Sequence, residues 1–560
     1  MTFTGPYPTV FGGNTAGMVI SNTTFSGGVT NVGTIGAGGI AVISSTLQSG
    51  GIIDTGTIVG GIKVDSSSTI VGSSGAAIAV IDTPTFGGGI RNAGVLSDST
   101  TGVLVSSVSA FTGGITNSGS ISGNGNGVEV AATSSFSGGI VNSAGGQIAA
   151  SRVGVFVSGV TAFSGGVINR SGGTISGSRT AIAIDNVNSF AGGMSNAGTI
   201  SAGVGGIAVK GLVHSGSVVL TFAGGISNSG NILVKGTGIA VAALASRSGT
   251  SATLATFAGG ITNSGTISGS NGIIFGGNPG QSQQAPNAQP LPPEAQPAGA
   301  APGAELVIIS NFSGGISNSG NIVASSGNGI AVNAFAHTGG SFTLATFAGG
   351  IRNTATISAT DVGIFIDARA SGSASVTIST FSGGVSNSGI VSANTGIAVG
   401  GRANGAGATV LISNFSGGIS NGGMISATSG TGIAVGGAAR LGGAFTLATF
   451  AGGVTNSGTI SGAAGVLIGG LAGRLPLGTT TRPADAPSEV ASVTISSFSG
   501  GINNRGNIVA NHGPGIAVDV MARSSGSFAL ATFAGGIGNS GTVSAALDGI
   551  RRTPPAPAAR

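Results

Sequence analysis

The sequence contains no cysteine and no tryptophan, a single tyrosine and few charged side chains. Without cysteine the chain can form no disulfide, no thiolate zinc site and no cysteine nucleophile. Charged residues make up 6% of its 560 residues, against about 25% in an average chain. Its 19 lysines and arginines are scattered among 14 acidic residues without a basic cluster. We therefore expect no nucleic-acid partner.

Long apolar runs are also missing. No window reaches about 18 uninterrupted apolar residues, the length that a membrane-spanning helix needs. Residues 1–20 contain neither a positively charged start nor a continuous apolar stretch, so we expect no ordinary signal peptide there. The mean hydropathy is nevertheless +0.47, and Ile and Val recur in clusters. A packed core is therefore available, unlike in a disordered chain.

Glycine is abundant, with 112 residues, and it is arranged in an internal repeat. The unit is Phe-x-Gly-Gly-(Ile/Val/Met)-x-Asn, usually followed by x-Gly-x-Ile, and a second element, Gly-(Ile/Val)-x-(Val/Ile), comes after it. A degenerate further copy has Gln48 at the Phe position and Asp54 at the Asn position. Fifteen copies begin at Phe25, Phe86, Phe111, Phe136, Phe163, Phe190, Phe222, Phe257, Phe312, Phe347, Phe381, Phe415, Phe450, Phe498 and Phe533.

The apolar residues of each unit occupy alternate positions in short runs broken by Gly and Asn, which predicts strands and excludes helices. Three runs and three turns in each unit fit one coil of a β-solenoid, in which the backbone pairs with the coils above and below. The predicted fold class is all-β, a right-handed parallel β-helix of about 16 coils. Successive copies lie further apart in the second half, and we expect this extra length to form loops before each Phe.

Stacking of coils predicts ladders of like side chains. The fifteen Phe residues are expected to form an inward aromatic ladder. Glycine pairs such as Gly113 and Gly114 are expected to form a bend whose backbone conformation a β-carbon would strain. An Asn follows each Phe by six residues. Its amide can donate to one neighbour and accept from the other, which predicts a structural corner ladder of Asn31, Asn92, Asn117, Asn142, Asn169, Asn196, Asn228, Asn263, Asn318, Asn353, Asn387, Asn421, Asn456, Asn504 and Asn539.

Two stretches rich in proline interrupt the repeat at its length-variable point. Because the repeat resumes after each, we interpret both as loops inserted into one solenoid, with domain boundaries as the alternative. The predicted segments are a cap or partial coil at 1–22, coils at 23–277, a Pro/Gln/Ala-rich loop at 278–303, coils at 304–474, a Pro-rich loop at 475–489, the last coils at 490–550 and a disordered Pro/Ala/Arg tail at 551–560.

The tandem units, such as Phe257-Ala-Gly-Gly-Ile-Thr-Asn-Ser-Gly-Thr-Ile267, resemble the passenger regions of bacterial autotransporters. The resemblance covers about residues 25 to 550. It implies a right-handed parallel β-helix at the cell surface, or outside the cell, of a Gram-negative bacterium. The family's secretion signal and its C-terminal membrane barrel are missing from this sequence, and one Tyr without Trp cannot form the aromatic girdles of a barrel. A separate outer-membrane barrel is therefore an expected partner.

Candidates for catalysis are sparse. Asp65, Asp185, Asp367 and Asp519 each follow a Gly-Ile-x-Val strand, so they are expected to share one column, separated by four or five coils. That spacing excludes the close carboxylate pair of a glycoside hydrolase. The exception is Asp65 with Asp82, which a degenerate coil would bring together; solvated loop acids are the alternative there.

The sequence also lacks motifs for other kinds of catalysis or for metal and phosphate binding. His214, His337 and His512 are expected in variable loops without an ordered partner set. No calcium-binding nonapeptide and no phosphate-binding lysine motif is present. We therefore predict no catalytic residue, no metal site and no cofactor. The expected activity is that of a non-catalytic scaffold for adhesion or self-association, whose ligand is a surface, a glycan or a protein. The alternatives are a carbohydrate-active β-helix enzyme, a lyase or glycoside hydrolase, and an orphan passenger fragment with a structural role only.

Overall fold

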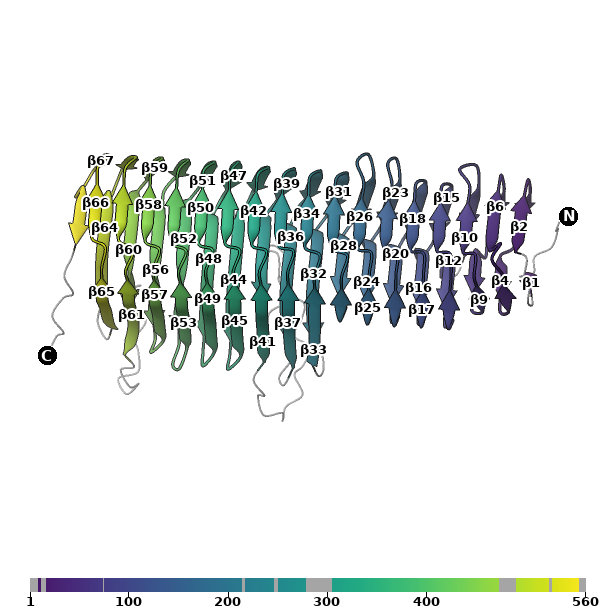
Figure 1. Cartoon of the computed structure of the whole chain (residues 1–560), viewed down its shortest axis with the longest axis horizontal. Coiled ribbons are helices and arrows are strands. Elements are labelled where there is room, and N and C mark those ends of the chain that lie inside the picture. Colours follow the sequence, from purple (N-terminus) through teal and green to yellow (C-terminus); the bar gives the residue numbers. More distant parts are fainter. Residues whose placement is uncertain are drawn as a thin grey trace, which may run out of the picture. The chain divides into compact units, whose positions relative to one another are not determined.

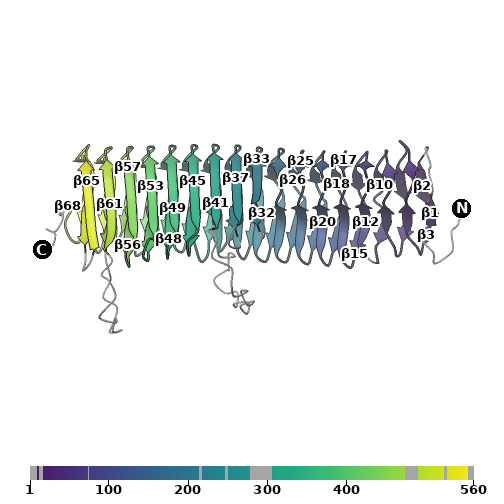
Figure 2. The ribbon, with the colours of Figure 1, turned by 90° about the horizontal axis from the view of Figure 1, so that it is seen from below.

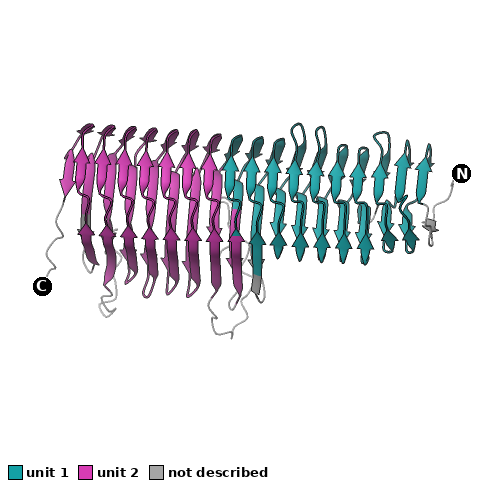
Figure 3. Cartoon of the chain, in the orientation of Figure 1, with its two compact units in different colours: residues 1–211, 219–240, 257–269 teal, residues 212–218, 241–256, 270–560 magenta. Residues whose placement is uncertain are grey.

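The computed structural model describes residues 9–11, 17–73, 75–213, 217–245, 250–277, 305–472, 490–522 and 526–552. The chain divides into two compact units (Figure 3). Unit 1 comprises residues 1–211, 219–240 and 257–269, and unit 2 comprises residues 212–218, 241–256 and 270–560. In its described residues, each unit contains strands and no helix, and the strands pair in parallel from coil to coil (Figure 1). The prediction of an all-β parallel β-helix of about 16 coils is confirmed.

One coil of unit 1 contains four strands, namely β17 (Ala110–Phe111), β18 (Ile115–Asn117), β19 (Ser120–Gly123) and β20 (Asn126–Ala131). Each pairs in register with its equivalent one coil on. The four stacks are called here the Phe sheet, the Asn sheet, the Ile sheet and the Val sheet, in that order. The prediction of three strands a coil is wrong, because the x-Gly-x-Ile run forms a strand of its own.

In-register pairing places like side chains on top of one another in the core. In unit 1, the six ring pairs from Phe86 to Phe257 have centroids 4.7–4.9 Å apart and planes inclined by 7° or less. In unit 2, the rings from Phe347 to Phe533 stack at 4.4–5.2 Å. Ile115, at the next inward position, is also buried. These columns remove apolar surface from water, which is the main favourable contribution to folding.

The asparagines form a second ladder, at the corner after the Asn sheet. From Asn92 to Asn263 in unit 1, each Nδ2 donates to the Oδ1 of the next asparagine at 2.7–2.9 Å. The same bond links the asparagines from Asn318 to Asn539 in unit 2, at 2.7–2.8 Å. The second amide hydrogen satisfies a turn carbonyl, as in the bond of Asn117 to the Gly119 oxygen. Burial of these amides is therefore compensated by hydrogen bonds.

The ladders begin at Phe86 and Asn92, and the prediction that Phe25 and Asn31 belong to them is wrong. Phe25 in β3 (Thr24–Phe25) is paired with Leu47 of the Ile sheet. Asn31 in β4 (Val29–Asn31) is paired with Asp54 of β8 (Ile52–Asp54), which is paired in turn with Val80 of the Val sheet. The first copy of the repeat thus lies half a coil out of phase with the others.

The slip is tolerated because both halves of a coil have the same pattern, an apolar residue, a bend and a short strand. Phe86 is paired with Ile58, and Asn92 with Val64, so each ladder starts against an apolar residue of the out-of-phase coil. The prediction for the degenerate copy is also wrong, since Leu47, and not Gln48, is paired with Phe25. Glycine pairs make the bends in both phases. Gly114 has a φ of +67°, and a β-carbon there would lie 2.5 Å from the Gly138 oxygen.

The coils of unit 2 are wider than those of unit 1. Their Val-sheet strands reach ten residues, as in β48 (Val362–Ser371), and their Phe-sheet strands have seven or eight, with seven in β49 (Ser375–Phe381). The corresponding strands β20 and β21 (Ser135–Phe136) of unit 1 have six and two. The extra residues of these coils therefore lengthen two strands that are joined by a tight turn, and the prediction of loops is wrong for them. Figure 2 shows the long strands β49 and β53 next to each other.

The segment boundaries are only partly within the described residues. Both proline-rich segments, 278–303 and 475–489, lie outside them. Of the segment 1–22, β2 (Met18–Ser21) pairs with β6 (Ile40–Ile43) as part of a coil. The expected disordered tail begins too early, because Arg551 and Arg552 belong to β68 (Ile550–Arg552), which pairs with β64 (Ile516–Ala522).

Replacing a central member of the Asn ladder tests its contribution to stability. In Asn142→Ala, the Nδ2 of Asn117 loses one of its three acceptors, and the Oδ1 of Asn169 loses its donor and stays buried. Since an unpaired buried polar group costs about 1–3 kcal/mol, we expect a loss of roughly 1–3 kcal/mol in urea unfolding. Asn124→Ala, an exposed turn residue of the adjacent coil, is the matched control and should change stability little. Equal effects of the two variants would contradict the ladder's role.

Asp54 offers a test of the half-coil slip. Its Oδ1 accepts from Asn31 Nδ2 at 2.6 Å, but its buried Oδ2 has no hydrogen-bond partner. Burial raises the pKa of this carboxyl, so folded-state stability is lost as the pH rises through that pKa. We expect Asp54→Asn to be more stable than the natural chain at pH 8, by about 1–3 kcal/mol, with a smaller advantage at pH 4.

The measurement is thermal unfolding of both proteins across this pH range. Asp65→Asn is a control of opposite sign, because a hydrogen bond from Ser68 lowers the pKa of Asp65. The stability that the Asp65 carboxylate contributes is present above its unfolded pKa and is lost as the pH falls. A pH dependence that is identical in the natural chain and in Asp54→Asn would contradict the assignment of a buried, half-satisfied carboxyl.

Candidate functional site

Charged side chains are rare in this chain, but several lie close together on the outward face of the Val sheet in unit 2. Inward positions of β48, such as Ile366 and Ala368, are fully buried, so the alternate residues Phe365, Asp367 and Arg369 point outward. On the next coil β52 (Thr395–Asn404) presents Arg402, and on the coil after that β56 (Thr431–Arg440) ends in Arg440.

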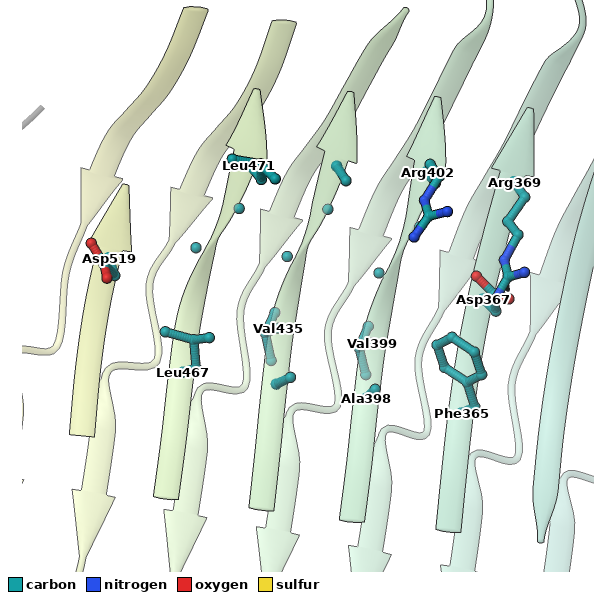
Figure 4. A pocket seen from close by; sticks show the side chains of 18 residues that line it. Phe365, Asp367, Arg369, Ala398, Val399, Arg402, Val435, Leu467, Leu471 and Asp519 are labelled. Atoms are coloured by element: carbon teal, nitrogen blue, oxygen red, sulfur yellow. Dashed lines mark ion pairs between the residues drawn. The ribbon is translucent and has the colours of Figure 1, made fainter. Parts of the chain in front are cut away.

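Strand register brings the three arginines together. Arg369 is paired with Arg402, and Arg440 with Asn404, two residues beyond Arg402. Neighbouring strands lie about 4.8 Å apart, so three guanidinium groups come from three successive coils. Figure 4 shows Arg369 and Arg402 on adjacent strands beside Asp367. The arrangement follows from equal offsets, because Arg369 and Arg402 each lie five residues after the inward Ile of their strand.

Asp367 is the carboxylate of this cluster. Its Oδ2 lies 2.6 Å from Arg369 Nε, and its side chain is 3% exposed whereas that of Arg369 is 49% exposed. Burial raises the pKa of Asp367 to about 6, against the opposing effects of Arg369 and Arg402. The Arg369 guanidinium is also held over the Phe335 ring at 5.2 Å and near the Phe365 ring at 5.9 Å, distances at which a cation is attracted to an aromatic face.

Arg402 and Arg440 have no such counter-ion. Three ion pairs occur among the described residues, and neither arginine belongs to one. Burial lowers the pKa of Arg402, and the positive charges of Arg440 and Arg369 lower it further. The Nε of Arg440 is buried without a hydrogen-bond partner. With three guanidinium groups and one carboxylate, the cluster carries an excess of positive charge at neutral pH.

A cavity of about 370 Å³ adjoins the arginines and continues along the sheet. Its floor is a column of outward positions without side chains, Gly400, Gly436 and Gly469, which connects Asp367 at one end with Asp519 of β64 at the other. Leu467 and Leu471 of β60 (Ala464–Ala472) form part of its wall.

Glycine is required in this floor. Gly436 has a φ of +149°, and a β-carbon there would lie 1.4 Å from the Gly469 oxygen. The cavity, which Arg369 and Arg402 line, is called the arginine groove below, together with Arg440 on the neighbouring strand. Figure 4 shows the cavity with Arg369 and Arg402.

Of the four aspartates expected in one column, the structure separates Asp65 from the others. Asp185 of β28 (Thr180–Asp185), Asp367 and Asp519 follow the equivalent core residues of Val-sheet strands. Asp65 follows β10 (Ile62–Val64), which belongs to the Asn sheet because of the half-coil slip, so its assignment to the column is wrong. Asp367 and Asp519 are four strands apart, roughly 19 Å, and do not form a catalytic pair.

The second candidate pair, Asp65 with Asp82, is not stacked either. Asp82 follows β12 (Ala76–Ile81) of the Val sheet, so the two carboxyls leave strands of different sheets. Asp65 instead accepts hydrogen bonds from the backbone of Ser44 and from the hydroxyls of Ser67 and Ser68. These bonds hold the turn after β10 and explain the lowered pKa of Asp65.

The histidines are equally dispersed. His337 is the last residue of β44 (Ile330–His337) and not part of a loop; its Nδ1 lies 2.5 Å from the Ser371 Oγ, and burial lowers its pKa. His512 lies in the turn between β63 (Asn507–Ala510) and β64. His214 lies outside the described residues. Within the described ranges, no group of three or more His, Asp or Glu side chains is placed to hold a metal ion.

The arginine groove was not predicted from the sequence, because its arginines are far apart in the chain and come together only when the strands are aligned. The signal existed in the equal offsets of Arg369 and Arg402 after Ile364 and Ile397. Comparison with known proteins adds nothing to this picture, since no family model, curated protein or solved structure matches the chain. No helix long and apolar enough to cross a membrane occurs in the part of the chain that the structure describes.

The pKa of Asp367 predicts a pH-dependent stability of unit 2. Because the folded-state pKa is raised from 3.8 to about 6, the contribution is fully present below pH 3.8 and is lost as the pH rises through about 6. The loss amounts to up to about 3 kcal/mol. We expect Asp367→Asn to remove this part of the pH dependence, measured as urea-unfolding free energies at pH 4, 5, 6 and 7. If the unfolding free energies of the two proteins change with pH in parallel over this range, the pKa of Asp367 is not raised and the prediction is wrong.

Proposed function

We propose that the chain is a non-catalytic β-helix scaffold of the autotransporter-passenger kind, which is displayed on or secreted from a Gram-negative bacterium and acts in adhesion or self-association. The Phe-x-Gly-Gly-Ile-x-Asn repeat supports the family, and the parallel β-helix agrees with it. The fold alone does not determine the activity, so the argument for binding rests on the outer surface of the coils.

The observation that carries the proposal is a column of uncharged hydrogen-bonding side chains on the Phe sheet of unit 2. The column occupies equivalent positions of successive strands, half-buried except for the exposed last one, so each coil offers a hydroxyl or amide at the same place. Its members are Asn311, Thr346, Thr380, Asn414, Thr449, Ser497 and Thr532. Such side chains both donate and accept. A surface that repeats its donors and acceptors once per coil suits a partner that is itself repetitive, such as a glycan or a second copy of the chain.

The enzymatic alternative has weaker support. A glycoside hydrolase needs two carboxyl groups about 5 to 9.5 Å apart, whereas Asp367 and Asp519 at the two ends of the arginine groove are separated by four strand spacings, roughly 19 Å. A scaffold needs no such pair, and its ligand contacts are distributed over many coils.

Adhesion and self-association are tested with the purified full chain. We expect saturable binding to cells by flow cytometry, or concentration-dependent association in sedimentation velocity. Thr380→Arg combined with Thr449→Arg places like charges on the hydroxyl column and should weaken that interaction. Ser386→Arg, an exposed position on the Asn sheet of the same coils, is the matched control. A chain that stays monomeric and binds no cell surface would contradict the proposal.

A further inference from the structure

The arginine groove has features of a binding site. Like charges placed opposite each other on neighbouring strands destabilise a sheet, yet Arg369 and Arg402 are paired in register and Arg440 lies two residues further along. One carboxylate, Asp367, interacts with Arg369 and Arg402, and Arg440 adds its positive charge next to Arg402. In a chain with 6% charged residues, three arginines on three successive coils exceed the negative charge that the described residues place beside them.

We propose that the arginine groove binds an acidic glycan, whose carboxylate or sulfate group is held by Arg402 and Arg440. This inference rests on the proposed function, since it assigns a ligand class to the adhesive surface. A guanidinium group presents planar, paired donors that match the oxygens of a carboxylate or sulfate. Arg440 lies diagonally opposite Arg402, and its Nε has no hydrogen-bond partner among the described residues.

The rest of the groove suits a sugar. Its glycine floor leaves room beside the sheet, and Leu467 and Leu471 offer apolar surface to the C–H face of a ring. At the far end, the Asp519 carboxylate, whose Oδ2 is paired with Arg551, has a second oxygen that can accept a hydrogen bond from a sugar hydroxyl. The cavity of about 370 Å³ lies in the range of small-ligand sites, about 300–1,000 Å³, which corresponds to a short stretch of glycan.

A nucleic acid fits less well. Its backbone carries a phosphate on every nucleotide, and the groove ends in carboxylates on both sides, Asp367 and Asp519. Binding of single strands also relies on aromatic side chains that stack on successive bases, whereas Phe365 is the one aromatic residue among those that line the groove. A ligand with one anionic group among many hydroxyls matches both the arginines and the acids.

The proposal is tested by calorimetric titration of the full chain with four probes: a sulfated heparin oligosaccharide, an oligogalacturonate, a neutral dextran oligosaccharide and a single-stranded oligonucleotide. We expect the chain to bind the sulfated probe, the carboxylated probe or both, and not the neutral one. Comparison of the two acidic probes shows whether the groove recognises a sulfate or a carboxylate group. Affinity should fall as salt rises, because the contact is ionic.

Two pairs of variants locate the contact. Arg402→Gln with Arg440→Gln should weaken binding by about tenfold or more, since hydrogen bonds to charged groups are the strong ones, whereas Arg352→Gln, an exposed arginine of β46 (Ile351–Asn353) on the Asn sheet, should not. Ala438→Glu places a carboxylate opposite Arg402 without removing any arginine and should have a similar effect. Because Ala438 lines the cavity, Ala438→Gln, of nearly the same shape as the glutamate variant but uncharged, controls for the lost space and should weaken binding less than Ala438→Glu.

Three results would overturn the inference: no saturable binding of either acidic glycan, equal losses in Arg352→Gln and the double variant, or an oligonucleotide that binds more tightly than both glycans. Cell binding of the same proteins separates this inference from the proposed function. If the natural chain binds cells but no acidic glycan, the groove assignment fails and adhesion stands. If it binds the glycan but no cells and no second copy, adhesion fails and the groove assignment stands.

Discussion

In-register parallel pairing between successive coils is the constraint on which the rest of this structure depends. Once the backbone of each coil is hydrogen-bonded to its neighbours about 4.8 Å away, every side chain has an equivalent above and below it. A position is then tolerable only if its residue packs well against copies of itself. Phenylalanine meets this condition by stacking, as in Phe111 on Phe136 at 4.7 Å. Asparagine meets it by donating to one copy and accepting from the other, as Asn117 does between Asn92 and Asn142.

The same constraint explains which parts of the fold could be predicted from the sequence. A strict repeat with alternating apolar residues indicates coils and ladders, because few other folds require one residue type at a fixed offset in copy after copy. The half-coil slip at Phe25 and Asn31 could not be predicted, since the two halves of a coil have the same apolar pattern and either phase fills the core. The number of strands in a coil was likewise hidden, because a Gly inside a run does not reveal whether the chain turns there.

Outward residues were harder to interpret than inward ones. The extra residues of the long repeats were expected to form loops, but Ile378 and Val376 continue the inward alternation of β49 and make it a longer strand. The aspartate column was predicted in part, for Asp185, Asp367 and Asp519, since their offset from the core Ile is fixed. The arginine groove depends on the pairing of Arg369 with Arg402 and on the diagonal position of Arg440, which follows only when the strands are aligned residue by residue.

Charge is the one property that a ladder of identical residues cannot accommodate, because each copy repels the next. Asp54 and Asp519 avoid this repulsion because their partners on neighbouring coils are uncharged: Asp54 lies between Asn31 and Val80, and Asp519 lies next to Gly469. Neutral outward columns, such as the one through Thr380 and Thr449, avoid it as well. Arg369 and Arg402 depart from this limit, since they place like charges opposite each other on neighbouring coils, as Lys63 and Arg91 do in unit 1. Asp367 neutralises one charge of the arginine pair, and an anion bound in the arginine groove, as proposed above, would neutralise the other.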